Sequence, residues 1–181
     1  MWGKCMKTFF GASVASLLLS SFAYSAEFAT GPLISNYGKH APVEGITLPA
    51  NTQFNIAFDV AGGADTGKIN RKFDSLARFL NMHVANGVKA ENIKLALVVH
   101  GSATLDVLTH THYQNKKGSS NSNVTLLNEL MNHGVRVIVC GQSAAANGVT
   151  NDMVVDGVEI ALSAMTAHAQ LSMNGYTTNP F

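Results

Sequence analysis

Length, composition and charge exclude several classes of protein. The chain has 181 residues, of which 46% are hydrophobic and only 13% are charged, so it is too apolar for a disordered protein. Its length fits one domain of ordinary size. The 12 basic and 11 acidic residues nearly cancel, and no basic stripe is present, which argues against a nucleic-acid-binding protein that relies on phosphate contacts.

Residues 1–26 have the features of a secretory signal peptide. Lys4 and Lys7 form a positive start, an apolar centre follows, and small residues come next. The apolar run is shorter than the roughly 20 residues that a membrane-spanning helix needs, and no other stretch is long and apolar enough. We therefore expect cleavage after Ser25 or Ala26 and a mature protein that is periplasmic or secreted, with no membrane anchor.

Cleavage at this position would remove Cys5 and leave Cys140 as the single cysteine. An intrachain disulfide would then be impossible, and a lone thiol is unusual in an oxidising compartment. We expect Cys140 to be buried and inert, paired between chains, or used in chemistry.

Residues 27–51 are expected to form an extended arm without a core of its own. The segment holds three of the four prolines, at Pro32, Pro42 and Pro49, together with several glycines. Such an arm could wrap around the body of the protein or around a neighbouring subunit. Its composition is one reason to expect a homo-oligomer.

Residues 52–181 form the predicted domain, in which strand patterns alternate with helix patterns. Strands are expected at 54–60, 94–99, 135–139 and 158–162. Helices are expected at 68–86, from Asn123 to Gly134, from near Gln142 onward, and at 164–174, with a long polar stretch at 101–122. This alternation predicts a single α/β domain, a three-layer α/β/α sandwich with a mainly parallel sheet.

Two of the predicted strands end in the same way. His100 and a glycine follow the strand at 94–99, and Cys140 and a glycine follow the strand at 135–139. Ligand sites of parallel α/β proteins lie beyond the carboxyl ends of the strands, so we expect His100 and Cys140 on one rim. A helix that begins just after Cys140 would favour the reactive thiolate, and His100 could accept a proton or donate a hydrogen bond. The alternative is that Cys140 is the last core residue of its strand.

Several stretches together resemble the DsrE/DsrF-like sulfur-relay family, in particular its exported members. They are Ala77–Asn81, Lys94–Gly101, Val137–Ser143, Ala161–His168, Gly175-Tyr176 and Asn179–Phe181. The resemblance covers roughly Phe54 to the C-terminus and implies a small α/β/α domain that forms homo-oligomers. It also implies that Cys140 accepts and passes on sulfur as a persulfide, and that His100 and Tyr113 match recurring positions.

The first hypothesis is therefore an exported sulfur carrier rather than a turnover enzyme. Cys140 would be the sulfur acceptor, His100 a thiolate partner and Tyr113 a residue of the same pocket. We expect no cofactor, and the partners would be further copies of the chain and a sulfur donor and acceptor that the sequence does not identify. Two alternatives stay open: a binding module for a metal or small anionic ligand at the same rim, and a non-catalytic oligomeric scaffold.

Three weaker signals have simpler interpretations. His110 and His112 have the side chains that zinc or copper prefers, but no C-x-x-C or H-E-x-x-H motif accompanies them, so we interpret them as exposed loop residues. The 62–68 segment has the spacing of a phosphate-binding loop, but Ile69 stands where a hydroxyl should hold magnesium, which favours a turn and helix cap whose amides could bind another anion. His168 is expected to be packed or interfacial rather than a ligand.

Overall fold

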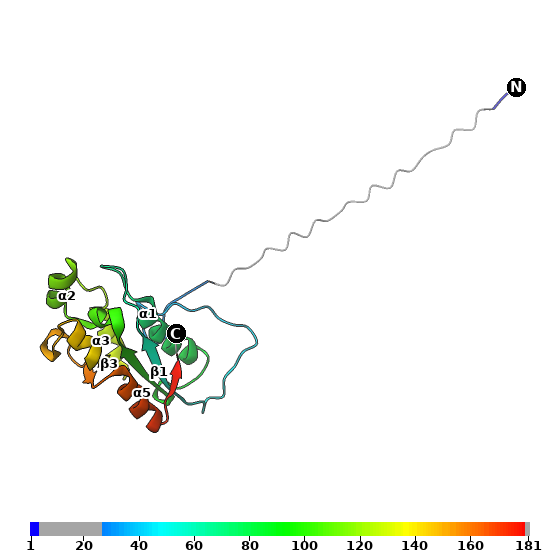
Figure 1. Ribbon diagram of the computed structural model, residues 1–181. Helices are drawn as coiled ribbons and strands as arrows, with labels where there is room; N and C mark the ends of the chain where they lie inside the picture. The colour runs from blue at the N-terminus through cyan, green and yellow to red at the C-terminus, as the bar shows by residue number, and fades with distance from the viewer. Residues whose placement is uncertain (4–26, 180–181) are drawn as a thin grey trace.

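The computed structural model describes residues 1–3 and 27–179 (Figure 1). The predicted signal peptide falls almost entirely on residues 4–26, which lie outside the described part of the chain. Within the described part, none of the helices combines the length and the apolar character that crossing a bilayer requires.

A five-stranded sheet forms the centre of the protein, with the strand order β4-β3-β2-β1-β5. All neighbouring strands are parallel, which confirms the predicted mainly parallel sheet. The strands are β1 (Phe54–Val60), β2 (Ile93–Val99), β3 (Arg136–Cys140), β4 (Glu159–Ala161) and β5 (Thr177–Asn179). The first four lie within one residue of the predicted bounds, whereas β5 was not predicted because it is short and polar.

Helices and short 3₁₀ turns connect the strands. The helices are α1 (Arg71–Ala85), α2 (His110–Lys117), α3 (Val124–Asn132), α4 (Gly141–Ala146) and α5 (Ala164–Met173), and the 3₁₀ turns are Ala90–Asn92, Gly101–Val107 and Asn151–Met153. The polar stretch at 101–122 is thus not a simple loop, since it contains a 3₁₀ turn and α2. Its sequence lacks an apolar stripe because α2 buries a single residue, Tyr113.

The start and the inward face of α1 follow from its sequence. The side chain of Asn70 accepts a hydrogen bond from the amide of Lys72, 3.0 Å away, which caps the helix. Apolar residues then recur at helical spacing and lie buried against the sheet. These buried residues are Phe73, Leu76, Ala77 and Leu80.

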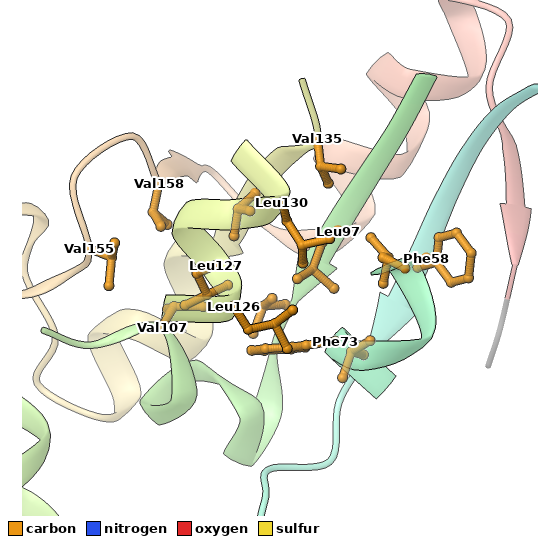
Figure 2. Close-up of a cluster of buried hydrophobic side chains, with 14 of the residues drawn as sticks. Phe58, Phe73, Leu97, Val107, Leu126, Leu127, Leu130, Val135, Val155 and Val158 are labelled. Carbon is orange, nitrogen blue, oxygen red and sulfur yellow. The ribbon is translucent and has the colours of Figure 1, made fainter. Parts of the chain in front are cut away.

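The larger core lies on the face of the sheet that α1 and α3 cover. Figure 2 shows Leu126, Leu127 and Leu130 of α3 gathered beside Leu97 of β2. Burial of each such side chain contributes about 1.5–3 kcal/mol to the free energy of folding. This core holds the helices in place behind the sheet.

The opposite face of the sheet carries a smaller core under α5. The side chains in this cluster are Ala57, Ala96, Val98 and Ile138 from the sheet and Ala167 and Leu171 from α5. The two cores on opposite faces make the three-layer α/β/α arrangement that the sequence predicted. Small residues on the strands allow α5 to approach the sheet closely.

The first part of the arm packs against α1 of its own chain. Ile34 is buried in the larger core. Asn81 of α1 receives hydrogen bonds from the amides of Leu33 and Ile34, at 3.1 and 2.7 Å, and donates to the carbonyl oxygens of Ile34 and Tyr37, both at 2.9 Å. Of the two placements that the sequence left open, this segment takes the one on the body of the same chain.

Candidate functional site

The carboxyl ends of the three central strands bring three reactive side chains to one edge of the sheet. Side chains on one face of a strand recur every second residue. The face under α5 carries Ala57, Val98 and Ile138. Each of these residues is followed two positions later by a reactive side chain: Asp59 follows Ala57, His100 follows Val98 and Cys140 follows Ile138.

These side chains line one hollow with a volume of about 430 Å³, which we call the Cys140 pocket. Its remaining walls come from the first turn of α4 and from the start and inner face of α5. The lining residues are Asp59, His100, Cys140, Gln142, Ser163, Ala164, Met165 and His168. The pocket thus combines a thiol, two imidazoles and a carboxylate with an apolar wall.

Cys140 ends β3 and directly precedes α4. It is only 6% exposed and is the one free cysteine in the described part of the chain. Burial opposes ionisation of its thiol, but hydrogen bonds from the amide and hydroxyl of Ser143 and from the amides of Ala164 and Gln142 outweigh burial, so the pKa of Cys140 lies below its ordinary value. The sulfur therefore sits in a cradle of donors that stabilises the thiolate.

His100 is not among the groups that lower the pKa of Cys140. Its Nε2 atom instead lies 3.2 Å from Oδ2 of Asp59. The sequence placed His100 and Cys140 on one rim, and the structure brings both into the same pocket. The hydrogen-bond partner of His100 there is a carboxylate rather than the thiolate.

Asp59 is shared by two histidines. Its Oδ1 atom lies 2.8 Å from Nε2 of His168, while Oδ2 faces His100. Burial raises the pKa of this carboxyl group, but the hydrogen bonds and charges of both imidazoles outweigh burial, so the pKa of Asp59 lies below its ordinary value. Asp59 is therefore an anion that holds two imidazole rings at the edge of the Cys140 pocket.

Asp59 and His168 were missed as site residues by sequence reasoning. Strand periodicity could have identified Asp59, because it lies two residues after Ala57 and therefore on the same face of β1, the face that α5 covers. His168 lies next to Ala167 and one turn after Ala164, on the side of α5 that faces the sheet. It is packed, as expected, but it is packed against Asp59 and into the pocket.

Tyr113 does not line the Cys140 pocket. It lies on α2, fully buried in the larger core on the other face of the sheet. Burial raises the pKa of its phenol, and a hydrogen bond with the backbone of Gly67 only partly opposes this. The aromatic ring fills the core beneath α2, which explains why it is not at the rim.

The two histidines of α2 also lie apart from the pocket. His110 is exposed, and its Nδ1 atom lies 2.8 Å from the hydroxyl of Ser120. His112 is partly exposed and lies two residues further along the same helix. Within residues 1–3 and 27–179, no three or more His, Cys, Asp or Glu side chains are arranged to hold a metal ion.

Two backbone amides of the glycine-rich segment after β1 are hydrogen-bonded to other groups of the protein. The amide of Gly63 donates to the hydroxyl of Ser102 at 2.9 Å, and the amide of Ala64 donates to the Asp106 carboxylate at 2.8 Å. A carboxylate thus stands where a phosphate-binding loop would hold its anion. The segment is a turn that leads to the Asn70 cap, as the sequence suggested.

Comparisons with known proteins agree with this architecture. The sequence profile of the DsrE/DsrF-like family matches residues 55–179. The structure resembles a protein of unknown function, MTH1491 from Methanobacterium thermoautotrophicum, with a TM-score of 0.54 and 15% identity over 71% of this chain and 100% of that chain. It also matches the ychN protein from E. coli, with a TM-score of 0.46 and 24% identity over 71% of this chain and 100% of that chain. No curated protein matches the sequence.

Proposed function

Because the chain belongs to the DsrE/DsrF-like family, we propose that it is an exported sulfur carrier in which Cys140 holds sulfur as a persulfide. The observation that carries this proposal is the cradle of hydrogen-bond donors around the Cys140 sulfur. A thiolate held in this way can accept sulfur and can also leave easily when the sulfur is passed on. The protein would be a carrier rather than a turnover enzyme.

Loading would begin with attack by the Cys140 thiolate on the outer sulfur of a donor persulfide, R–S–SH. The bond between the two donor sulfurs breaks as the new bond forms, which gives Cys140–S–SH and the donor thiolate R–S⁻. No external oxidant or reductant is needed, because the sulfane sulfur moves at its own oxidation level. The donor and the final acceptor are both thiols or their persulfides.

The proposal places the mature protein in the periplasm or outside the cell. It is supported by the signal-peptide features of residues 1–26, with Lys4 and Lys7 before an apolar centre. Loss of that segment would leave Cys140 without a second cysteine in its own chain, so the thiol would stay available for sulfur.

We also propose that the protein acts as a homo-oligomer. Exposed apolar side chains beside the pocket support association, since Leu162 is 73% exposed and Met165 is 80% exposed. Sedimentation of the mature protein at micromolar concentration tests this, and a monomer there would contradict it.

Intact-mass analysis of protein purified from its native compartment tests the sulfur-carrier proposal. We expect an increase of one sulfur atom, about 32 Da, that reductant removes and that maps to Cys140. The Cys140→Ser variant, purified in parallel, should lack this adduct. A wild-type protein that never gains sulfur, even after incubation with a small-molecule persulfide, would refute the proposal, and a metal ion released on unfolding would favour a binding module.

A further inference from the structure

A chain of hydrogen bonds runs from the C-terminal strand into the Cys140 pocket. The hydroxyl of Thr178 lies 3.5 Å from Nδ1 of His168, and Nε2 of His168 lies 2.8 Å from Oδ1 of Asp59. Oδ2 of Asp59 then lies 3.2 Å from Nε2 of His100. This series of hydrogen bonds ends at His100, which lines the pocket beside Cys140.

The direction of the proton in each bond follows from the carboxylate. The pKa of Asp59 is lowered, so the group is ionised and can only accept hydrogen bonds. Nε2 of both His100 and His168 must therefore carry a hydrogen. In the neutral ring, Nδ1 is then left as an acceptor.

The two histidines differ in what their Nδ1 atoms contact. Nδ1 of His168 faces the hydroxyl of Thr178, so both of its ring nitrogens contact protein groups. Nδ1 of His100 hydrogen-bonds no group among residues 1–3 and 27–179, and 30% of the His100 side chain is exposed. His100 is thus the ring that can still accept a proton from a bound molecule.

Cys140 does not need that acceptor. Its thiolate is stabilised by hydrogen bonds from Ser143, Gln142 and Ala164, and His100 makes no contribution to them. A second thiol must nevertheless enter the pocket for sulfur to leave, and an ordinary thiol has a pKa of about 8.5, so it is mostly protonated at neutral pH.

We infer that His100 is the catalytic base that deprotonates the incoming acceptor thiol, and that Asp59 is the positioning residue that fixes the ring for this role. This inference rests on the proposed function, because it assigns the unloading step of the same site. His168 and Thr178 hold Asp59 from the other side. The acceptor is therefore a thiol of ordinary acidity rather than one that is already ionised.

The unloading step balances as Cys140–S–SH + R–SH → Cys140–S⁻ + R–S–SH + H⁺, with the proton bound at Nδ1 of His100. The acceptor sulfur forms a bond to the outer sulfur of the persulfide while the bond to the Cys140 sulfur breaks. The electron pair of the broken bond stays on Cys140, where the hydrogen-bond donors stabilise it.

A methyl disulfide on Cys140 allows a test that does not need the native cargo. Methyl methanethiosulfonate converts Cys140 to Cys140–S–S–CH₃, and an acceptor thiol then removes the methylthio group, which mass spectrometry follows. Free cysteine serves as the ordinary acceptor, and 2-nitro-5-mercaptobenzoate serves as an acceptor that is already ionised. Failure of native Cys140 to carry sulfur would be seen separately, by intact mass.

The His100→Ala variant should slow removal by cysteine while leaving removal by the ionised acceptor nearly unchanged. At pH 6.5 only about 1% of an ordinary thiol is ionised, so loss of the base can cost up to about 100-fold in rate. Added imidazole should restore part of the lost rate in the variant and should not accelerate the wild type. Asp59→Asn should show the same dependence on the acceptor, with a smaller loss.

The matched control is His133→Gln, since His133 is an exposed histidine at the end of α3. This variant should match the wild type with both acceptors. If His100→Ala slows removal of the methylthio group equally with both acceptors, or does not slow its removal by cysteine, the inference is overturned. If circular dichroism shows that His100→Ala is unfolded, Asp59→Asn with the two acceptors decides in the same way.

Discussion

Replacement of Asn81 with alanine tests how the arm is attached to the domain. The Asn81 side chain is fully buried and makes hydrogen bonds to backbone groups of the arm at Leu33, Ile34 and Tyr37. Alanine makes none of these bonds. The arm has no regular helix or strand in the described part, so side-chain partners such as Asn81 satisfy backbone groups that its few backbone pairs, such as Ala29 with His40, leave open.

The cost can be worked out from the burial of each bond. Both bonds to Ile34 are buried, but its carbonyl group also accepts a hydrogen bond from the amide of Gly31 at 3.0 Å, so only the Ile34 amide would lose its partner where water cannot replace it. The longer buried bond to the Gly38 carbonyl, at 3.4 Å, would be lost as well. The bonds to Leu33 and Tyr37 are only partly buried, and water can take over there. The orphaned Ile34 amide, together with the weaker bond to Gly38, gives a loss of about 2 kcal/mol in the free energy of unfolding.

Urea unfolding followed by circular dichroism measures this loss. Asn92→Ala is the matched control, because the Asn92 side chain also donates to the arm, at the carbonyl of Ala50, but through an exposed bond of 3.3 Å. The control should change the free energy of unfolding by less than about 0.5 kcal/mol. An Asn81→Ala variant as stable as this control would refute the role given to the buried bonds.

Three further predictions concern the pocket and its supports. Ser143→Ala removes the hydroxyl donor to the Cys140 sulfur but keeps the amide donor, so the pKa of the thiol should rise and alkylation at neutral pH should slow. An unchanged pH–rate profile would argue against a role for this hydroxyl. Gly141→Ala would place a Cβ atom 2.6 Å from the carbonyl oxygen of Ala161, so thermal unfolding should show a loss of about 1–3 kcal/mol in the free energy of unfolding. Unchanged stability would contradict this, because it would mean that β4 shifts away from the new Cβ atom at no cost. The Asp59 carboxyl has a lowered pKa in the folded protein, so the stability it contributes is present above its unfolded pKa of about 3.9 and is lost as the pH falls. The difference in the free energy of unfolding between wild type and Asp59→Asn should therefore shrink below about pH 4. A difference that stays constant with pH would contradict this.

The sheet could be predicted because its central strands are short apolar runs separated by helix-length segments. β2 is buried on both faces, and its unbroken apolar sequence reflects this directly. β5 could not be found in the same way, since Thr177–Asn179 is polar and forms only when it pairs with β1. Its pairing depends on α5 returning the chain to that edge of the sheet.

The candidate site was predictable only in part, for a related reason. His100 and Cys140 each follow an apolar run, so the edge rule for parallel sheets was enough to place them together. Asp59 lies inside the predicted strand, and its role depends on His168, which is 109 residues away in the sequence. Tyr113 was placed in the pocket only by resemblance, and its burial under α2 is a tertiary feature that local pattern does not show.

The rate of alkylation of Cys140 as a function of pH tests the central claim most directly. The folded protein should react with iodoacetamide through a single ionisation whose pKa lies below the ordinary value of about 8.5 for a cysteine thiol, because the surrounding donors outweigh burial. A thiol that reacts only after the protein unfolds, or that titrates at or above the ordinary pKa, would show that Cys140 is a core residue and would contradict the sulfur-carrier proposal.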